Sequence, residues 1–344
     1  MIVITVVGSG QMGSAMSFPA RDNGHELRLA GTFLDDEIIE QAARTGYHKT
    51  LKRQLPDGVK YFYFSGLDDA LDGADLIISG VSSFGVDWFA DEIIPRLPRS
   101  APVLSVTKGM FNFHGGSLLS YPGFYAKKYP DRRFYAVGGP CTSYELADRD
   151  QTHIAFCGND ARELSSLKKI FGTEYYHISA TSDTEGLECA VAIKNAYALA
   201  VTLAVGLSNK KDGSQHYNSQ AALFGQSVAE MRKLLALFGF GCDNIIYGAG
   251  DLYVTVFGGR TRMIGTLLGE GVPFGEAMAA LKGVTLESVV IAKRTAEAVR
   301  ELIKTGRANE CDYPLLLHID EIISRGAEVN IPWEKFTSNG IEPA

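Results

Sequence analysis

The stretch Met1-Ile-Val-Ile-Thr-Val-Val-Gly-Ser-Gly-Gln-Met-Gly13 decides the fold, because it joins an apolar run to a glycine-rich loop. The run up to Val7 has the composition of a buried strand, and Gly8, Gly10 and Gly13 fit the pattern G-x-G-x-x-G. Between a strand and a helix, such glycines permit a tight turn, a close approach to a pyrophosphate and close helix–strand packing. The N-terminus of the helix would face the phosphates. We therefore expect a dinucleotide site here; the simpler interpretation is a tight turn without a ligand.

The overall composition is that of an ordinary globular protein. The 344 residues are too many for one core of usual size, so we expect two domains. Apolar residues make up 46% and charged residues 21%, and the formal net charge is -7. A negative chain has no general attraction for nucleic acid or anionic lipid, so we expect neither as a partner. An anionic ligand would need a local cluster of Lys and Arg.

The cysteines indicate neither disulfides nor a zinc site, because no two of them have C-x-x-C spacing. They are Cys141, Cys157, Cys189, Cys242 and Cys311. The apolar start of the chain lacks the basic segment and the cleavage site of a secretory signal. We therefore expect no metal, a reducing compartment and a cytoplasmic location.

The first half of the chain alternates strand-like and helix-like segments, which is typical of a doubly wound parallel sheet. The predicted strands are 2–7, 26–30, 59–64, 76–80, 102–106, 134–138, 152–158 and 174–178, and the predicted helices are 13–22, 35–45, 86–97 and 161–171. From about residue 183 the pattern is helical throughout, over 184–207, 218–238, 243–256, 274–280 and 287–303. We therefore predict a dinucleotide-binding Rossmann domain over 1–181 and an all-α substrate and catalytic domain over 182–344.

The end of the second predicted strand does not indicate which dinucleotide binds. Leu27-Arg-Leu-Ala-Gly-Thr32 carries no acid at its end to bind a ribose hydroxyl, and Asp35 and Asp36 come late. No arginine follows directly to neutralise a 2′-phosphate. The choice between NAD and NADP stays open.

Polar residues follow three of the other strands, where ligands bind in open α/β sheets. They are Ser82-Ser83, Thr107-Lys108-Gly109 and Gly139-Pro140-Cys141-Thr142. Lys108 could meet a phosphate or a substrate oxygen; a solvated surface lysine is the alternative.

Lys194 is a lysine in an almost wholly apolar segment, Ala190-Val-Ala-Ile-Lys-Asn-Ala-Tyr-Ala-Leu-Ala200. The surrounding run, 189–207, has about the length of a membrane span, but a lysine at mid-membrane costs roughly 2.5–3.5 kcal/mol. We therefore expect a buried helix of a globular domain. Burial favours a neutral amine, which suits proton transfer near neutral pH. A snorkelling lysine, or an ion pair with Glu185 or Glu188, is the alternative.

Two features further along could complete a site with Lys194. Asp251 is a natural partner for a buried lysine, although it could equally cap a helix. Gly258-Gly259-Arg260-Thr261-Arg262 places two arginines beside a Gly-Gly turn, which suits a phosphate clamp because guanidinium binds such groups bidentately. An exposed basic turn is the alternative.

These segments, in this order, resemble the NAD(P)-dependent glycerol-3-phosphate dehydrogenase family. The resemblance covers roughly residues 1–300. It is carried by Gly8-Ser-Gly-Gln-Met-Gly, Val106-Thr-Lys-Gly, Gly139-Pro, Ala192-Ile-Lys-Asn, Asn218-Ser-Gln-Ala-Ala-Leu, Gly250-Asp-Leu, Gly259-Arg and Leu267-Leu-Gly-Glu-Gly.

The resemblance implies reversible reduction of dihydroxyacetone phosphate to sn-glycerol 3-phosphate by hydride transfer from NADH or NADPH. Separately, the large apolar helices of the second domain lead us to expect a homodimer. It implies that Lys194 is the general acid/base and that Asp251 supports it. The implied substrate residues are Lys108, Gly139, Asn195, Thr255, Arg260 and Thr261. The implied cofactor residues are Gly8, Gly10, Gln11, Met12, Gly13, Lys108, Ser143, Arg260 and Glu287.

Several departures from the family pattern keep alternatives open. Thr261 replaces the asparagine that usually follows Gly-Arg, and Ala30-Gly-Thr32 replaces an aromatic–glycine–arginine strand end. A ketopantoate reductase-like enzyme, or another 2-hydroxyacid dehydrogenase of the same architecture, would need a carboxylate clamp instead of a phosphate clamp. A dinucleotide-binding sensor without turnover would leave the buried Lys194 unexplained.

Overall fold

The strand that begins the chain, β1 (Val3–Val7), lies inside an eight-stranded sheet in the computed structural model, which describes residues 1–113 and 116–336. The spatial order is β12-β11-β10-β7-β6-β1-β2-β5. From β5 to β10 this is the 3-2-1-4-5-6 order of a dinucleotide-binding sheet. The remaining bounds are β2 (Glu26–Ala30), β5 (Val59–Phe62), β6 (Leu76–Ser79), β7 (Val103–Ser105), β10 (Phe134–Gly138), β11 (Thr152–Cys157) and β12 (Tyr176–Thr181).

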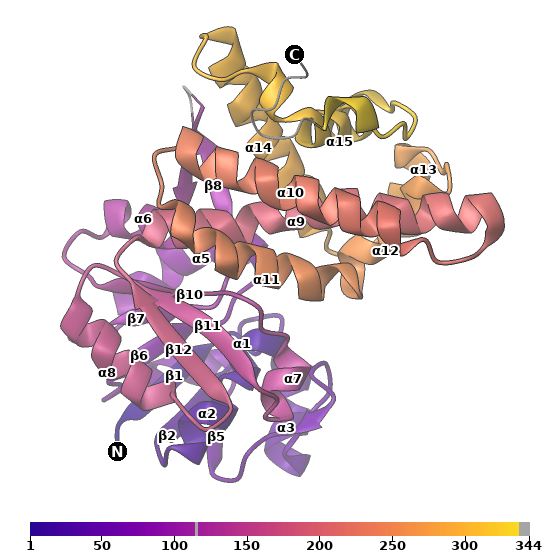
Figure 1. Cartoon of the computed structure of the whole chain (residues 1–344). Coiled ribbons are helices and arrows are strands. Elements are labelled where there is room, and N and C mark those ends of the chain that lie inside the picture. The colour runs from indigo at the N-terminus through magenta and orange to yellow at the C-terminus, as the bar shows by residue number, and fades with distance from the viewer. Residues whose placement is uncertain (114–115, 337–344) are drawn as a thin grey trace. The chain divides into compact units, whose positions relative to one another are not determined.

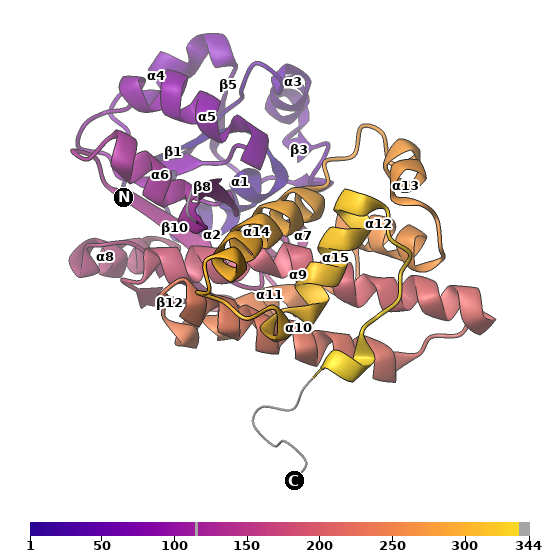
Figure 2. The same ribbon diagram turned by 90° about the horizontal axis from the view of Figure 1, so that it is seen from above.

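The sheet is mostly parallel and has helices on both faces (Figures 1 and 2). The exception is β10–β11, which pair antiparallel with Ala136 opposite Cys157. The connection between them holds only the short α7 (Ser143–Ala147), whereas a parallel connection needs a crossover that spans the sheet. The prediction of a parallel sheet therefore misses this junction. β11 and β12 run parallel to each other and antiparallel to the other strands of the sheet.

The predicted helix over 13–22 is two helices, α1 (Gln11–Ala15) and α2 (Ser17–Asp22), which meet at Met16. Pro19 has no N–H to donate to the carbonyl four residues earlier, so the regular helix is interrupted there. The remaining helices of this part are α3 (Asp36–Thr45), α4 (Leu67–Leu71), α5 (Val86–Trp88), α6 (Tyr121–Lys128) and α8 (Ala161–Phe171). After α5 the helical path continues as a π-helix over Phe89–Ile93 and a 3-10 turn over Ile94–Arg96.

The chain divides into two compact units. Unit 1 comprises Met1–Gly109 and Ser120–Glu188, and unit 2 comprises Met110–Leu119 and Cys189–Ala344. The predicted division into a cofactor domain over 1–181 and a substrate domain over 182–344 assigns roles as well as bounds, and it stays a prediction.

Unit 2 is built from helices that surround the long helix α9 (Thr184–Asp212). Within residues 1–113 and 116–336, α9 alone is long and apolar enough to cross a membrane, and 94% of its most apolar window is buried. Its residues from Cys189 onward form the centre of the core of unit 2. The other helices are α10 (Tyr217–Leu237), α11 (Ile245–Val256), α12 (Gly259–Gly269), α13 (Phe274–Ala280), α14 (Glu287–Lys304) and α15 (Pro314–Arg325).

Two two-stranded sheets and the helices α4, α6, α7, α12 and α15 were not predicted. The pair β3 (Tyr47–His48) and β4 (Arg53–Gln54) belongs to unit 1, and β8 (Met110–Phe113) and β9 (Ser117–Ser120) form the other pair. Arg294 of α14 donates a hydrogen bond of 2.7 Å to the carbonyl oxygen of Met110, which ties β8 to the helices of unit 2. The helix α12 begins in the segment that the sequence indicated as a Gly-Gly turn, and α15 lies in a segment that was left unassigned.

Candidate active site

The glycine-rich loop lies where the strand order of unit 1 reverses, between β1 and β6. Gly8 has φ +99°, and a β-carbon there would lie 2.9 Å from the backbone of Gly80 at the end of β6. A β-carbon on Gly10 would lie 3.1 Å from the carbonyl oxygen of Gly80, and one on Gly13 would lie 2.9 Å from its α-carbon. Glycine at these three positions therefore lets the loop pack closely against Gly80, at the switch point where dinucleotides bind in such sheets.

Asp35 braces this loop from the segment that follows β2. Its Oδ2 accepts hydrogen bonds from the backbone N–H and the hydroxyl of Thr32, each at 2.8 Å, and from the N–H of Ser9 at 3.2 Å. The acid that comes late in the sequence thus joins the second strand end to the glycine loop.

His48, in β3, also braces the glycine loop. Its Nδ1 accepts from the N–H of Leu51, so the proton is assigned to Nε2, which lies 3.0 Å from the carbonyl oxygen of Ser9. Burial lowers the pKa of His48, in keeping with a neutral ring that holds the loop.

A cavity of about 270 Å³ opens beside the glycine loop, within unit 1. Aromatic side chains form much of its wall: the rings of Phe33 and Trp88 meet edge to face with centroids 5.5 Å apart, and Phe84 is two-thirds exposed. Flat apolar surface of this kind suits the base of a nucleotide. The lining consists of Gly8, Gly10, Thr32, Phe33, Leu34, Asp35, Gly80, Val81, Ser82, Phe84, Gly85 and Trp88. The sequence analysis missed Gly80 and the three aromatic residues, although a glycine after a buried strand is a signal for the first.

Lys108 and Gly139 come together at the carboxyl ends of β7 and β10. The Nζ of Lys108 donates to the carbonyl oxygen of Gly139 at 3.1 Å, and Gly139 has φ +129°. Ser143, the first residue of α7, is buried nearby in sequence. At the start of α1, the side chain of Gln11 donates to the carbonyl oxygen of Thr50, and Met12 packs partly against the core of unit 1.

In unit 2, the buried Lys194 and Asp251 and the half-buried Thr255 form a polar group. The Nζ of Lys194 donates to Oδ1 of Asp251 at 3.0 Å and to the hydroxyl of Thr255 at 2.7 Å. That hydroxyl in turn donates to the carbonyl oxygen of Asp251 at 2.7 Å, so its lone pairs face the ammonium. Lys194 is 6% exposed and Asp251 is 2% exposed. The predicted pairing with Asp251 is present, and Asp251 lies inside α11, so it does not cap the helix.

The group depends on a close approach between α9 and α11. A β-carbon on Gly248 would lie 2.8 Å from the carbonyl oxygen of Ala190, so only glycine allows the two helices to come this near. Lys194 lies one turn beyond Ala190, and Asp251 lies about one turn beyond Gly248. The glycine therefore sets the spacing that lets the lysine reach the carboxylate.

The remaining predicted residues of unit 2 lie on three helices. Asn195 is buried on α9, next to Lys194 in sequence. Gly258 and Gly259 lead into α12 instead of forming an isolated turn, because Gly259 adopts φ +79° as the helix begins. Arg260 is therefore an exposed side chain in the first turn of a helix, where backbone N–H groups also favour anions. Thr261 is buried beside it, and Glu287 begins α14.

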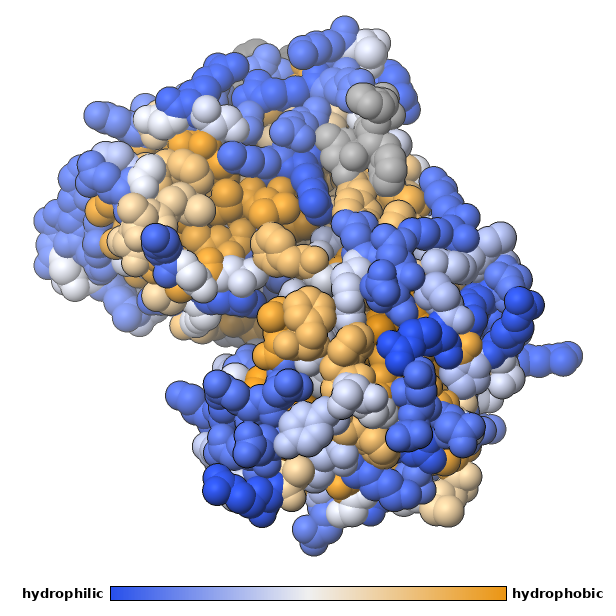
Figure 3. All heavy atoms as spheres, turned by 180° about the vertical axis from the view of Figure 1, so that it is seen from behind, coloured by the Kyte–Doolittle hydropathy of each residue, from blue (hydrophilic) through white to orange (hydrophobic). Residues whose placement is uncertain are grey.

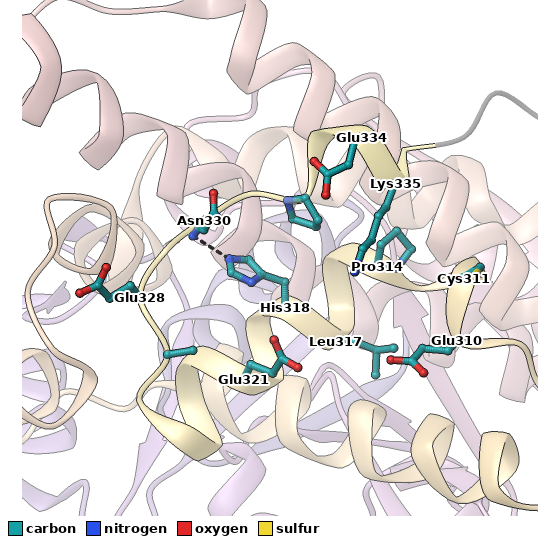
Figure 4. Close-up of a pocket in the computed structure, with 12 residues that line it drawn as sticks. Glu310, Cys311, Pro314, Leu317, His318, Glu321, Glu328, Asn330, Glu334 and Lys335 are labelled. Carbon is teal, nitrogen blue, oxygen red and sulfur yellow. Dashed lines mark hydrogen bonds between the residues drawn. The ribbon is translucent and has the colours of Figure 1, made fainter.

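A second cavity, of about 480 Å³, lies around α15 (Figure 4). The Nε2 of His318 accepts a hydrogen bond from the N–H of Asn330 at 3.2 Å at its wall. Four carboxylates line this cavity against one lysine, so it is unsuited to a phosphorylated ligand. The carboxylates are those of Glu310, Glu321, Glu328 and Glu334, and the lysine is Lys335.

Two family models match the chain. The N-terminal model of NAD-dependent glycerol-3-phosphate dehydrogenase matches residues 3–163, and the C-terminal model of the same enzyme matches residues 183–333.

Similar proteins carry related names. An NADP(+)-dependent glycerol-3-phosphate dehydrogenase of Archaeoglobus fulgidus is 32% identical over 333 residues, which cover 95% of this chain and 97% of that protein. A glycerol-3-phosphate dehydrogenase [NAD(P)+] of Maridesulfovibrio salexigens is 27% identical over 88% of both chains. The fold is that of a Plasmodium falciparum glycerol-3-phosphate dehydrogenase, with a TM-score of 0.82 at 20% identity over 99% of this chain and 96% of the other. The chain therefore belongs to the NAD-dependent glycerol-3-phosphate dehydrogenase family.

Proposed function

We propose that this protein is an NAD(P)-dependent glycerol-3-phosphate dehydrogenase that interconverts dihydroxyacetone phosphate and sn-glycerol 3-phosphate. The observation that carries the proposal is the buried ion pair of Lys194 and Asp251, with the hydroxyl of Thr255 on the ammonium, in a chain of this family. Burying an ammonium between one carboxylate and one hydroxyl costs desolvation free energy. A role in proton transfer explains why the lysine is nevertheless buried here.

Lys194 is the general acid/base. In the reducing direction its ammonium donates a proton to the C2 oxygen of dihydroxyacetone phosphate, and in the oxidising direction the neutral amine accepts the proton of the C2 hydroxyl. Asp251 and Thr255 hold the Nζ atom in position and stabilise its charged form. The nicotinamide cofactor, when bound, supplies the hydride to C2 or accepts it from C2.

Arg260 binds the phosphate of the substrate. Its guanidinium is exposed in the first turn of α12, so bidentate hydrogen bonds and the helix N-terminus both favour an anion. We assign Thr261 and Asn195, both buried in unit 2, to the substrate as well. In unit 1, Lys108, whose Nζ donates to the carbonyl oxygen of Gly139, provides a cation at the carboxyl ends of two strands. Binding energy from the phosphate then positions C2 for reaction.

The glycine loop of unit 1 holds the dinucleotide. Gly8, Gly10 and Gly13 let the loop pack tightly against Gly80, and the pyrophosphate then binds at this loop while the aromatic cavity beside it accommodates the adenine. Gln11, Met12, Ser143, Lys108, Arg260 and Glu287 complete the proposed contacts with NAD or NADP.

We further propose a cytoplasmic homodimer. Large apolar side chains remain exposed on the helices of unit 2, and apolar surface is visible on one face of the molecule (Figure 3). They include Tyr217, Ile246, Tyr253, Phe257 and Met263, with between 48% and 68% of each accessible. Exposed apolar surface is typical of subunit interfaces, and this supports the proposal.

The test is oxidation of NADH and of NADPH, followed by absorbance, with dihydroxyacetone phosphate as the second substrate. We expect turnover that requires the phosphate, and we expect Lys194→Met to reduce kcat by about 10²–10⁴-fold, the usual contribution of a general acid/base. Preferential turnover of a 2-keto acid would instead favour a ketopantoate reductase-like enzyme. Tight NADH binding without turnover of any small ketone would favour a sensor, and a Lys194→Met variant of normal activity would refute the mechanism.

A further inference from the structure

The two-stranded sheet of β3 and β4 contacts the glycine-rich loop through a side chain that the proposed mechanism does not use. The Nε2 of His48, at the end of β3, lies 3.0 Å from the carbonyl oxygen of Ser9 and 2.9 Å from the hydroxyl of Ser14. The imidazole is fully buried, and its Nδ1 accepts from the N–H of Leu51 at 3.1 Å. The proton is therefore on Nε2, which donates to the loop.

Both backbone groups of Ser9 are held inside unit 1. Its N–H donates to Oδ2 of Asp35 at 3.2 Å, and its carbonyl oxygen accepts from His48. Ser9 itself has no exposed surface. Two side chains from different segments therefore fix the two peptide planes that meet at this residue, and neither of its backbone groups is offered to a ligand.

The contact at Ser9 also orients the next N–H of the loop. In a planar trans peptide the C=O and the N–H point in opposite directions, and the described residues contain no cis peptide bond. Because the carbonyl of Ser9 points to the buried His48, the N–H of Gly10 points away from it. Gly10 is exposed and lines the cavity of about 270 Å³, and within residues 1–113 and 116–336 no group accepts from its N–H. The loop thus presents a backbone donor on its exposed side.

We propose that His48 is a positioning residue for the dinucleotide: by holding the carbonyl oxygen of Ser9 inside the protein, it directs the N–H of Gly10 to the pyrophosphate. The inference rests on the proposed function only for the presence of a dinucleotide at this loop. His48 has no exposed surface with which to contact a ligand, so it acts through the peptide bond between Ser9 and Gly10.

The consequence is an effect on affinity that depends on the phosphates of the ligand. Loss of the contact between His48 and Ser9 should weaken the binding of ADP-ribose by about tenfold, the lower end for a hydrogen bond to a charged group. The affinity for adenosine, which reaches only the aromatic cavity, should stay the same. A general disturbance of the fold would weaken both ligands, so the comparison separates positioning from a merely structural role.

Two amide variants separate the two nitrogens of His48. The longer side chain of His48→Gln places an N–H near the position of Nε2, so it keeps the donor for Ser9 but loses the acceptor for Leu51. The shorter side chain of His48→Asn keeps an acceptor for Leu51 near the position of Nδ1 but does not reach Ser9. We expect a Kd for ADP-ribose near that of the wild type in His48→Gln and about tenfold higher in His48→Asn. The matched control is Ser14→Ala, which removes the other partner of Nε2 and should change neither Kd.

The experiment measures the Kd of ADP-ribose and of adenosine from the fluorescence of Trp88, which lines the cavity. Trp333, the other tryptophan of the chain, is replaced by phenylalanine in every protein compared. Thermal unfolding of each variant monitors folding.

A wild-type Kd for ADP-ribose in His48→Asn would overturn the inference, and so would a loss of affinity that adenosine shares. An equal loss in His48→Gln and His48→Asn would also overturn it, because only the second lacks a donor for Ser9. Failure of the wild type to reduce dihydroxyacetone phosphate would instead overturn the proposed function. The binding measurements need no turnover, so in that event the difference between the two amide variants still decides the role of His48.

Discussion

A β-carbon on Gly248 would lie 2.8 Å from the carbonyl oxygen of Ala190. This contact between α11 and α9 brings Asp251 within 3.0 Å of the Nζ of Lys194. The geometry of the Lys194–Asp251 pair, which we propose to be catalytic, therefore depends on the close packing at Gly248.

The first prediction is that Gly248→Ala separates the two helices and lowers kcat by about 10²-fold, the effect expected of a misplacement of about 1 Å. Overpacking should also lower the free energy of unfolding by about 1–3 kcal/mol. The control is Gly225→Ala on α10, where the added β-carbon meets no atom within 4 Å. That change should leave kcat unaltered and raise stability by about 1 kcal/mol. Equal kcat values for both variants would contradict the prediction; steady-state kinetics and urea unfolding provide the measurements.

Local patterns predicted the features that depend on neighbouring residues. The glycine spacing after β1 indicated the switch point of the sheet, because a tight turn and a close backbone approach each require glycine at a fixed offset. The burial of Lys194 followed from apolar residues on every side of its helix.

The features that were missed depend on distant segments. The antiparallel β10–β11 pair reflects the path of residues 139–151, which leaves no room for a crossover. The sequence could not separate a capping role for Asp251 from a partner of Lys194, because the answer lies in how α11 packs on α9. The Gly258-Gly259 pair suggested a turn, yet the left-handed Gly259 begins a helix. The bracing of the glycine loop by Asp35 also depends on a contact 26 residues away in sequence.

The second prediction concerns Glu230, a buried carboxyl group on α10. Its oxygens accept hydrogen bonds from the backbone N–H groups of Leu315 and Leu316, the hydroxyl of Tyr197 and the amide of Gln226. Burial raises the pKa of Glu230 to about 7, although the hydrogen bonds from these donors act to lower it. Because the folded state then binds a proton that the unfolded state has lost, stability should fall as pH rises from about 4.5 to about 7 and should level above that range.

This contribution amounts to roughly 3 kcal/mol over that range, at about 1.4 kcal/mol for each tenfold change in proton affinity. Urea unfolding of the wild type and Glu230→Gln across pH provides the measurement. Because other acids titrate in both proteins, the difference between the two curves isolates Glu230. The free energy of unfolding of the wild type minus that of Glu230→Gln should decrease as pH rises from about 4.5 to about 7. A difference that is constant with pH would refute the assignment.

The third prediction concerns the hydroxyl of Thr255. It accepts from the ammonium of Lys194 and donates to the carbonyl oxygen of Asp251, both at 2.7 Å. Thr255→Val keeps the shape but removes the acceptor, so kcat should fall by roughly ten- to a hundredfold, corresponding to a lost hydrogen bond to a charged group. Thr255→Ser keeps the hydroxyl and should retain most of the activity. If the valine and serine variants had the same kcat, the hydroxyl would have no part in holding Lys194.

The fourth prediction separates phosphate binding from chemistry at C2. Arg260 is exposed at the start of α12, and the proposal gives it the phosphate of the substrate. Arg260→Met should lower kcat/KM for dihydroxyacetone phosphate by about ten- to a hundredfold, since a charge-assisted hydrogen bond contributes about 1.5–3 kcal/mol.

The same variant should leave kcat/KM for unphosphorylated dihydroxyacetone unchanged, because that substrate offers the arginine no anion to bind. Arg260→Lys should recover part of the loss with the phosphorylated substrate, since a lysine keeps the charge but not the bidentate geometry. Arg262 provides the comparison on the same helix: its guanidinium already donates to the carbonyl oxygen of Val256 at 2.9 Å, so Arg262→Lys should not distinguish the two substrates. An equal loss with both substrates in Arg260→Met would assign Arg260 to the cofactor or to the structure of α12 instead of the phosphate.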